Sequence, residues 1–322
     1  MVQDFIAGID IGGTKIAVAI ASAEGELVGR SSFPTEPDRA PQEAMTQALE
    51  TLVRLAKTHQ GQLASIGIGC AGPLDFDLGD VLSPPNMPRS WRQFPLRSFV
   101  ENELQLPVAL DNDANAAALG EHLYGAGRGY NDLVYLTIST GIGVGIIAGD
   151  NLVHRLGEGG HVTVQPGGAL CGCGARGCME TLCSGTGIAR RAQEKLRSGR
   201  SSKMLEIVGV SNIQQVTAKT VEHAAREGDD LATEVWRETI DLLAIGIGSI
   251  VALLAPQVVI LGGGVAAGAG EFLLQPLRDA LKERVHIVSM QGVKVLQAGL
   301  GSESVLQGAL VLAARAIQPV RT

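Results

Sequence analysis

The stretch Phe5-Ile-Ala-Gly-Ile-Asp-Ile-Gly-Gly-Thr-Lys-Ile-Ala-Val-Ala-Ile20 consists of two apolar runs separated by a glycine turn. Apolar runs bounded by such a turn predict two adjacent strands. Glycines allow backbone N–H groups in the turn to face an anion, and the hydroxyl of Thr14 adds a donor. An ordinary hairpin turn explains the same glycines equally well, so this turn alone leaves both interpretations open.

The same layout returns in the middle of the chain. Setting residues 9–20 beside residues 136–147 aligns both strands and the turn between them, which is Ser139-Thr-Gly-Ile-Gly143 in the second copy. Repetition of this kind predicts an internal duplication. A third glycine turn, Gly262-Gly-Gly264, follows the apolar run Val258–Leu261. Three such turns can surround the phosphates and adenosine of one nucleotide, so we expect a nucleotide site between two similar halves.

Hydrophobic periodicity predicts that strands and helices alternate over most of the chain. We expect helices over residues 41–58, 114–124 and 305–317, and strands over 65–70, 107–110, 133–138 and 144–147. The last helix has apolar residues spaced to pack on a sheet and could return to the first half. This pattern is typical of an α/β protein.

Composition narrows the function classes. The 322 residues carry a net charge of -7, whereas binding of a nucleic-acid backbone needs clustered Lys and Arg. No basic segment leads into an apolar run at the N-terminus, and the apolar run 242–255 is shorter than the about 20 residues of a membrane-spanning helix. We therefore expect a cytoplasmic protein of two domains that acts on small molecules, without nucleic-acid or membrane partners.

One imidazole and three thiols gather within residues 161–178, as His161, Cys171, Cys173 and Cys178. Zn²⁺ prefers four nitrogen or sulfur ligands in a tetrahedron, and four protein ligands leave no open position for water. The alternative is a disulfide, which the odd cysteine total and the missing secretion signal disfavour. The spacing predicts structural zinc, while Cys70 and Cys183 are expected to be buried apolar residues.

These motifs together resemble a known family. The first turn resembles the phosphate-1 loop of the sugar kinase, heat-shock protein and actin superfamily, and Thr140-Gly-Ile-Gly143 is similar to its phosphate-2 loop. Three further segments resemble the ROK family of bacterial sugar kinases and repressors. They are Asp111-Asn-Asp-Ala-Asn-Ala-Ala-Ala118, Gly157-Glu-Gly-Gly-His161 and Cys171-Gly-Cys-Gly-Ala-Arg-Gly-Cys-Met-Glu180. The resemblance extends from residue 5 to the segment that begins at Gly308.

The resemblance implies a two-lobed α/β fold of the actin-like ATPase type, built from duplicated ribonuclease H-like domains around an interdomain cleft. The smaller lobe is expected to comprise residues 1–118 and 305–322. The larger lobe is expected to comprise residues 119–304, including the zinc loop 161–178, with a hinge near residue 118.

The resemblance also implies an ATP-dependent hexose kinase, with glucose and its 6-hydroxyl as the expected acceptor. The catalytic base falls on Asp113, although position alone is equally consistent with a helix cap. Implied sugar contacts are Gly72, Asn86, Asn112, Asp113, Glu158, His161 and Glu180. Implied Mg-ATP contacts are Asp10, Gly12, Gly13, Thr14, Lys15, Thr140, Gly141, Gly143, Gly262, Gly263 and Gly264. Asp10 is the expected partner of hydrated Mg²⁺.

Alternatives remain at this point. Fructose, mannose, allose or an N-acetylhexosamine could replace glucose, polyphosphate could replace ATP, and a sugar-sensing regulator is the alternative from another class. A homo-oligomer, dimer or tetramer, is also expected. Two departures from the family pattern stand out: Gly159 replaces a bulkier residue and is expected to loosen the loop of Glu158, whereas Ser139 replaces glycine without expected harm.

Overall fold

The computed structural model describes residues 3–83, 87–154, 157–287, 290 and 292–317. The chain forms two compact units. Unit 1 comprises Met1–Gly129, Gly145–Leu156 and Ser302–Thr322, and unit 2 comprises Tyr130–Val144 and Gly157–Gly301. The hinge expected near residue 118 concerns motion and stays a prediction.

Unit 1 is built on a five-stranded sheet of order β3-β2-β1-β4-β7. β1 pairs antiparallel with β2 and parallel with β4, and β4 pairs parallel with β7. These strands are β1 (Gln3–Ile11), β2 (Lys15–Ser22), β3 (Leu27–Pro34), β4 (Gly61–Cys70) and β7 (Val108–Asn112). A small hairpin of β5 (Leu74–Asp75) and β6 (Asp80–Val81) follows β4. The strands expected at 5–20, 65–70 and 107–110 are therefore confirmed.

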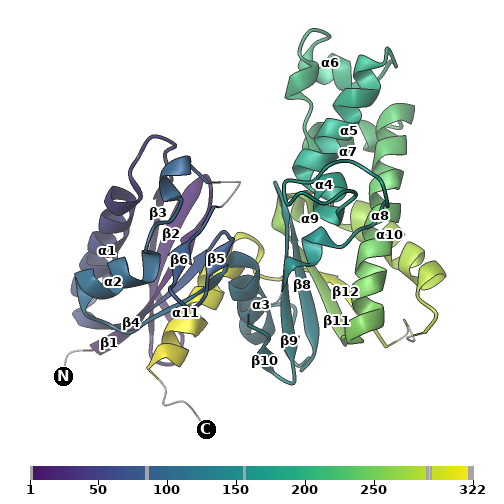
Figure 1. The fold of residues 1–322 in the computed structure, drawn as a ribbon. Coiled ribbons are helices and arrows are strands. Elements are labelled where there is room, and N and C mark those ends of the chain that lie inside the picture. The colour runs from purple at the N-terminus through teal and green to yellow at the C-terminus, as the bar shows by residue number, and fades with distance from the viewer. Residues whose placement is uncertain (1–2, 84–86, 155–156, 288–289, 291, 318–322) are drawn as a thin grey trace. The chain divides into compact units, whose positions relative to one another are not determined.

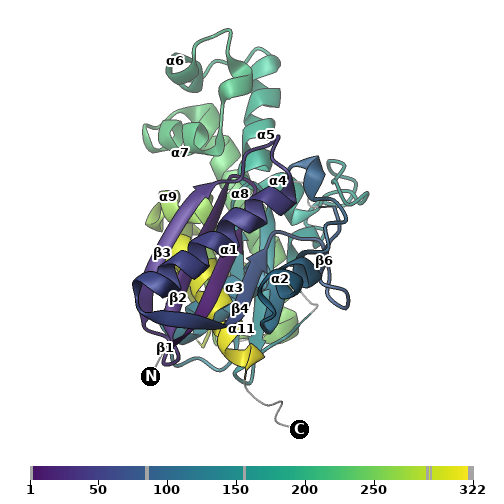
Figure 2. The same ribbon diagram turned by 90° about the vertical axis from the view of Figure 1, so that its left-hand side faces the viewer.

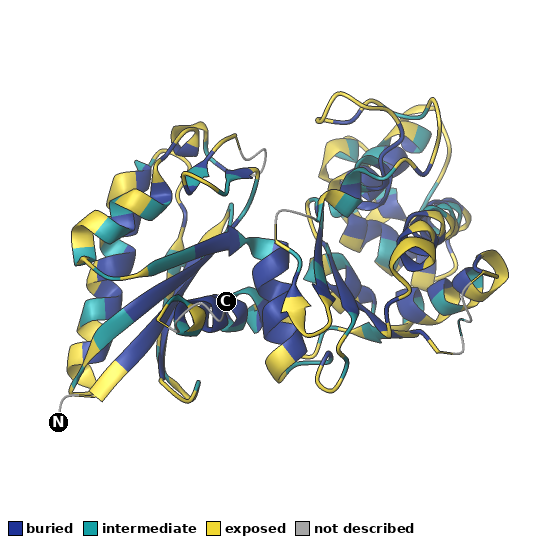
Figure 3. Cartoon of the chain, turned by 60° about the horizontal axis from the view of Figure 1, so that its bottom comes forward, coloured by how far each residue is buried: buried dark blue, intermediate teal, exposed yellow. Residues whose placement is uncertain are grey.

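Helices cover both faces of this sheet because its central strands are apolar on both sides. Figures 1 and 2 show α1 and α2 on one face and α11 on the other. Alternate β1 residues from Phe5 to Ile11 pack with α1 and α2, whereas Ile6 packs with α11 on the opposite face. Figure 3 shows the central strands buried and α1 exposed on its outer side. The helices of unit 1 are α1 (Pro41–Thr58), α2 (Leu96–Leu104), α3 (Asp113–Tyr124), α11 (Ser304–Ala316) and the 3-10 turn η1 (Arg89–Trp91).

α11 approaches the sheet and α3 at backbone distance. A Cβ on Gly67 of β4 would lie 1.8 Å from the Ala309 carbonyl oxygen. A Cβ on Gly308 would lie 1.6 Å from the Ala116 carbonyl oxygen of α3. No side chain fits at either position, so these two glycines allow the C-terminal helix to pack on unit 1.

The second sheet has the order β10-β9-β8-β11-β12, and the part of its β9–β10 hairpin from Gly145 onward belongs to unit 1. β11 pairs parallel with both β8 and β12. Taken along the chain, the five strands of each sheet follow the same order, third-second-first-fourth-fifth. The duplication predicted from the sequence is therefore confirmed. The strands are β8 (Leu133–Ile138), β9 (Ile142–Ala148), β10 (Asn151–Leu152), β11 (Val258–Gly262) and β12 (Lys294–Gln297).

Unit 2 carries most of the helices, and a buried arginine joins two of them. Arg191 on α5 donates to the Leu182 carbonyl at 3.1 Å and to Glu238 Oε2 of α8 at 2.9 Å. Among the described helices, none combines the length and the apolar character that crossing a membrane requires. The helices are α4 (Met179–Cys183), α5 (Gly185–Arg197), α6 (Met204–Val208), α7 (Ala218–Arg226), α8 (Asp230–Leu254), α9 (Gly263–Ala269) and α10 (Glu271–Arg284). Short 3-10 turns are η2 (Glu158–His161), η3 (Ile213–Gln215) and η4 (Gly301–Glu303).

Candidate functional site

The first glycine turn joins β1 to β2 in unit 1. The Gly12 N–H donates to the Lys15 carbonyl oxygen at 3.0 Å and closes the turn. Thr35, directly after β3, contacts the turn twice: its N–H donates to the Thr14 carbonyl oxygen at 3.1 Å, and its hydroxyl donates to the Gly12 carbonyl oxygen at 2.7 Å. The turn is thus held by a residue that the sequence motif did not include.

The parallel strands of unit 1 bring the carboxylates of Asp10 and Asp113 to one edge of the sheet. Asp10 pairs with Gly69 of β4, and Gly69 pairs with Asp111 of β7, so Asp10 and the residues that follow β7 lie at the same edge. Burial raises the pKa of Asp10 from 3.8 to about 7; the negative charge of Asp113 contributes in the same direction, and Lys15 opposes it. A divalent cation bound at Asp10 would offset the free-energy cost of keeping the buried Asp10 carboxylate ionised near the Asp113 carboxylate.

The strand-to-helix junction after β7 places Asn112 and Asp113 at the start of α3. Asn112 is the N-cap, and its side-chain oxygen accepts from the Ala114 N–H at 2.8 Å. Asp113 Oδ1 accepts from the same N–H at 2.8 Å. Because Asn112 holds the cap position, the Asp113 carboxylate is not required for capping, and the N-terminal end of the helix favours its ionised form.

Asp111 stabilises this junction through hydrogen bonds. It is 1% exposed, and its Oδ1 accepts from the Asn112 N–H at 2.8 Å and from Asn115 Nδ2 at 2.7 Å. Its Oδ2 lies 2.8 Å from His154 Nδ1. A carboxylate satisfied by three donors is rigid, so Asp111 fixes the backbone from which Asn112 and Asp113 project.

Two weaker sugar-contact predictions also fall in unit 1. A Cβ on Gly72 would lie 2.9 Å from Asn112 Nδ2, so the absence of a side chain there lets the Asn112 amide lie against the backbone. Asn86 lies outside the described residues, as do its neighbours 84 and 85.

The second glycine turn joins β8 to β9 in unit 2. The Ser139 N–H donates to the Gly141 carbonyl oxygen at 2.9 Å within the turn. The start of α5 supports it, because the Gly185 N–H donates to the Ser139 carbonyl oxygen at 2.6 Å and the Thr186 hydroxyl donates to the Thr140 carbonyl oxygen at 2.9 Å. Gly143 follows on β9. The turn is present as predicted.

The third glycine segment forms the junction of β11 and α9, since Gly262 ends the strand and Gly263 and Gly264 begin the helix, beside the end of β8. Gly263 has φ +83°, and a Cβ there would lie 2.5 Å from the Ile138 carbonyl oxygen. A Cβ on Gly262 would lie 2.2 Å from the Tyr135 hydroxyl, whereas Gly264 faces open space. The adjacent strands β8 and β11 therefore carry the second and third turns at the same edge of the sheet of unit 2.

The predicted metal ligands come together in unit 2. The ligand atoms of His161, Cys171, Cys173 and Cys178 all lie within 4.8 Å of one another. His161 Nδ1 lies 3.5 Å from Cys171 Sγ, and Cys173 Sγ lies 3.7 Å from Cys178 Sγ. Thiolates on a tetrahedral zinc ion are roughly 3.8 Å apart, given Zn–S bonds of about 2.3 Å. The side chains present therefore fit a zinc ion with four protein ligands.

Two of the loop glycines have the positive φ that makes glycine necessary. Gly174 has φ +91° and Gly177 has φ +76°, and a Cβ on Gly177 would lie 1.7 Å from the Gln165 carbonyl oxygen. Gly172 has neither a positive φ nor a neighbour within 4 Å, so a side chain would fit at that position.

The loop also positions two carboxylates that the sequence singled out. Glu180 Oε2 accepts from the Ile142 N–H of β9 at 2.9 Å, which connects the zinc loop to the second glycine turn. Glu158 Oε2 lies 3.7 Å from His161 Nε2, and the Glu158 side chain is 80% exposed. Since His161 Nδ1 faces the thiols, its Nε2 is the ring nitrogen directed toward Glu158.

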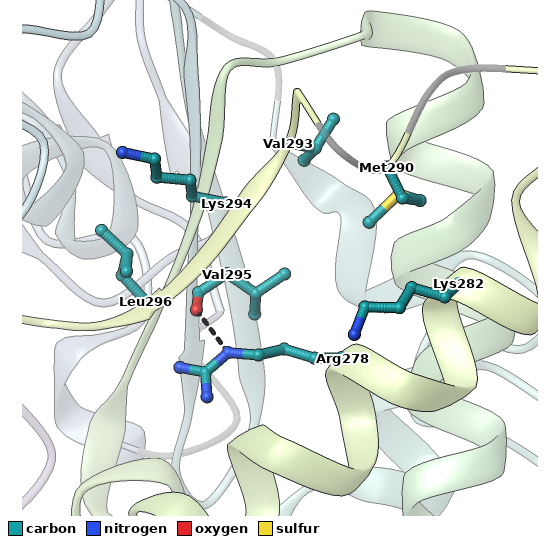
Figure 4. Close-up of a pocket in the computed structure, with 7 residues that line it drawn as sticks. All are labelled: Arg278, Lys282, Met290, Val293, Lys294, Val295 and Leu296. Carbon is teal, nitrogen blue, oxygen red and sulfur yellow. Dashed lines mark hydrogen bonds between the residues drawn. The ribbon is translucent and has the colours of Figure 1, made fainter.

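A pocket between α10 and β12 lies apart from these residues. Its volume is about 280 Å³, and Figure 4 shows Arg278 donating to the Val295 carbonyl oxygen across it. Its three cations have partners: Arg278 pairs with Glu271, Lys282 pairs with Asp279, and Lys294 Nζ lies 5.5 Å from the centroid of the Tyr130 ring. None of the predicted site residues lines it, so this pocket does not belong to the candidate site.

Comparison with known proteins decides the family. A model of the ROK family matches residues 6–316. The chain belongs to the ROK family. A glucokinase from Halalkalibacterium halodurans is 36% identical over 305 residues, with 92% of this chain and 91% of that protein covered.

Solved structures agree with this assignment. The ROK family glucokinase from Streptomyces griseus in complex with glucose and AMPPNP has a TM-score of 0.79 at 34% identity, covering 97% of this chain and 99% of that chain. The ROK hexokinase from Thermus thermophilus has a TM-score of 0.83 at 34% identity, with the same coverage. The actin-like ATPase fold expected from the sequence is confirmed for this ROK protein.

Packing explains why glycine occupies position 159, where this chain departs from the ROK pattern. A Cβ there would lie 2.7 Å from Val144 Cγ2 and 3.4 Å from Ile250 Cδ1. Val144 is 2% exposed, so the space of a side chain at position 159 is occupied by a core residue. Whether the loop of Glu158 is looser than in relatives stays a prediction.

We expect Gly159→Ala to lower the free energy of unfolding by about 1–3 kcal/mol, because Val144 must shift to admit the methyl group. Urea unfolding measures the change. Adding Val144→Ala should recover part of the loss, since the two sites share one space. Gly268→Ala is the matched control, because nothing lies within 4 Å of that position. An equal effect of Gly159→Ala in the presence and absence of Val144→Ala would show that the clash is not the cause.

The raised pKa of Asp10 predicts a pH dependence of stability. The folded-state pKa of about 7 exceeds the unfolded value of 3.8, so the folded state binds this proton more tightly. Stability from this group is therefore full below about pH 4 and is lost as the pH rises toward 7. At about 1.4 kcal/mol per pKa unit, the loss amounts to a few kcal/mol at most.

We therefore expect Asp10→Asn to increase the free energy of unfolding strongly at pH 8 and less at pH 5, without nucleotide or Mg²⁺. Comparing the variant with wild type at each pH removes contributions of other groups, including the zinc ligands. Exposed Asp38→Asn serves as the control. Parallel stability profiles for wild type and Asp10→Asn would mean that Asp10 is ionised at neutral pH in both folded and unfolded chains.

Sequence reasoning missed two residues that support the site, Thr35 and His154. Thr35 contacts the first turn from 23 positions away, and His154 contacts Asp111 from 43 positions away. Neither belongs to a motif, and a lone threonine or histidine carries no signal of its own. Only the register of the strands brings them into contact.

Proposed function

We propose that this ROK protein is a glucokinase that transfers the γ-phosphoryl group of Mg-ATP to the 6-hydroxyl of glucose. The observation that carries the proposal is the Asp111-Asn112-Asp113 junction, where a buried carboxylate and an asparagine cap fix the position of Asp113 at the start of α3. The glucokinases at 34–36% identity and near-complete coverage support the choice of reaction and sugar.

Asp113 is assigned the role of general base. The glucose O6 attacks the γ-phosphorus, the bond from that phosphorus to the β,γ-bridging oxygen breaks, ADP leaves, and the O6 proton passes to the Asp113 carboxylate. Phosphoryl transfer through a loose transition state needs little proton removal at the start, so orientation of the hydroxyl is the larger contribution. The three donors on Asp111 supply that orientation by holding the junction rigid.

The glycine turns are assigned to the nucleotide. In unit 1 these residues are Asp10, Gly12, Gly13, Thr14 and Lys15, and in unit 2 they are Thr140, Gly141, Gly143, Gly262, Gly263 and Gly264. Mg²⁺, when bound, neutralises charge on the phosphates, and Asp10 would hold it through water. The raised pKa of Asp10 supports this assignment, because burial and the negative charge of Asp113 outweigh the positive charge of Lys15, and a bound cation would offset the difference.

Sugar binding is assigned to residues of both units. Unit 1 would contribute Gly72, Asn86, Asn112 and Asp113, and unit 2 would contribute Glu158, His161 and Glu180. Structural zinc on His161, Cys171, Cys173 and Cys178 would hold His161 in place, with Nε2 directed away from the metal to donate to a sugar hydroxyl. The geometry of His161, with Nδ1 toward the thiols and Nε2 toward Glu158, supports this role.

The test is ADP release from Mg-ATP across glucose, fructose, mannose, allose and N-acetylated hexosamines, with polyphosphate as an alternative donor. Turnover with glucose at the highest kcat/KM supports the proposal, and preference for another hexose replaces glucose by that sugar. Sugar binding without ADP release from any hexose would instead favour a sugar-sensing regulator.

We also propose a homo-oligomer, a dimer or tetramer, because α8 presents apolar side chains to solvent. Leu253 is 83% exposed and Ile245 is 36% exposed in the single chain. Light scattering at several protein concentrations tests this, and a monomer at every concentration would contradict it.

A further inference from the structure

Thr35 is a buried polar residue with an unusual position relative to the first glycine turn. It is 0% exposed, it follows the last residue of β3, and its N–H and hydroxyl are both directed at the turn. Its N–H donates to Thr14 and its hydroxyl donates to Gly12. The residue that directly follows β3 therefore contacts the turn between β1 and β2.

The two contacts have different consequences. The N–H bond to Thr14 extends the β2–β3 ladder, whose last pair is Lys15 with Pro34, by one step. The hydroxyl bond lies outside this ladder and reaches the carbonyl oxygen of Gly12 at 2.7 Å. Strand pairing thus accounts for the backbone bond and leaves the hydroxyl unexplained.

The hydroxyl sets the direction of one peptide group. Within the described residues the only cis peptide is Gly72–Pro73, so the Gly12–Gly13 peptide is trans and planar. In a trans peptide the C=O and the following N–H point in opposite directions. Because Thr35 draws the Gly12 carbonyl toward itself, the Gly13 N–H is turned away from Thr35. Glycines on both sides of the peptide would otherwise leave it free to rotate.

We propose that Thr35 is a positioning residue for phosphate binding: its hydroxyl holds the Gly12–Gly13 peptide so that the Gly13 N–H is preset to donate to a phosphate oxygen. The inference rests on the proposed function, since it assigns the first turn to the nucleotide. A donor held in place before binding loses no conformational entropy when the anion arrives, so preorganisation is expected to improve nucleotide affinity.

Thr35→Val is the informative change, because valine keeps the shape and removes the donor. We expect the KM for Mg-ATP to rise about 5- to 10-fold, which corresponds to one hydrogen bond, while the KM for sugar stays within about twofold. Thr35→Ser, which keeps the hydroxyl, should restore the KM for Mg-ATP. A variant that merely loosened the fold would change both KM values, so the split between them is the diagnostic readout.

Calorimetric titration with Mg-AMPPNP separates this inference from the proposed function. If wild type binds Mg-AMPPNP but phosphorylates no hexose, the kinase proposal fails, and a weaker Kd for Thr35→Val than for Thr35→Ser still supports the role of Thr35. Equal Kd values for wild type and Thr35→Val overturn it, as does wild type that binds no nucleotide. Should Thr35→Val fail to fold, Thr35→Cys carries the test, because a thiol is a weak donor.

Discussion

Asp113→Asn is expected to lower kcat for hexose phosphorylation about 10²- to 10⁴-fold, the range for loss of a general base. Sugar affinity should change little, because the amide has the shape of the carboxylate. Its oxygen can still accept from the Ala114 N–H, which Asp113 Oδ1 accepts at 2.8 Å, so the start of α3 should remain intact. What the amide cannot do is accept the proton of the sugar hydroxyl. Steady-state kinetics and sugar titration measure the two quantities.

Asp111→Asn is the matched control for this variant. It removes the same charge two residues earlier, but at a carboxylate that is 1% exposed and bound by Asn112, Asn115 and His154. We expect it to reduce the free energy of unfolding more than Asp113→Asn does, since it disturbs a buried hydrogen-bond network. A kcat of Asp113→Asn within tenfold of wild type would remove Asp113 from the role of base.

Replacing Cys178 by Ala is expected to abolish stoichiometric zinc binding and to weaken sugar affinity about 10- to 100-fold. Cys178 is 0% exposed at the start of α4, and the loss of its thiolate leaves three ligands for an ion that structural sites bind with four. His161 and Glu180 both belong to this loop, and hydrogen bonds to charged groups contribute about 1.5–3 kcal/mol each. Misplacing one such contact is sufficient for the expected loss.

Metal analysis and sugar titration of the same preparation give the result. Cys183→Ala provides the control: Cys183 is also buried and lies five residues further along, but its Sγ faces the Thr239 carbonyl rather than the cluster. It should retain zinc and sugar affinity. Zinc loss in Cys178→Ala with unchanged sugar affinity would show that the metal stabilises the loop without orienting sugar contacts. Full zinc content in that variant would place the ion elsewhere.

Through Glu180, the zinc loop also contacts the second glycine turn, which is assigned to the nucleotide. Its carboxylate accepts from the Ile142 N–H, one residue after Gly141 of the second glycine turn. Loss of zinc should therefore disturb this turn as well as the sugar contacts. The KM for Mg-ATP in Cys178→Ala is the quantity that would report it.

Local patterns in the sequence were sufficient for the strands, the duplication and the metal cluster. The four ligand residues fall within residues 161–178, so a single loop brings them together without help from distant segments. The strand-turn-strand repeats are likewise contained in short segments, and helix 41–58 was predicted with the bounds that α1 has. Each of these depends on neighbours in sequence, which periodicity and spacing describe directly.

Tertiary structure alone decided how the site residues are supported. The Thr35 hydroxyl on Gly12, His154 on Asp111 and Val144 in the space beside Gly159 join segments whose spacing in sequence carries no pattern. The raised pKa of Asp10 is also a tertiary effect, because it depends on burial and on the charge of Asp113 at the same edge of the sheet. Composition determined that glycines, carboxylates and thiols were available for this chemistry. Strand register and helix packing determined which of them meet, since a contact between distant segments depends on the position of every element between them.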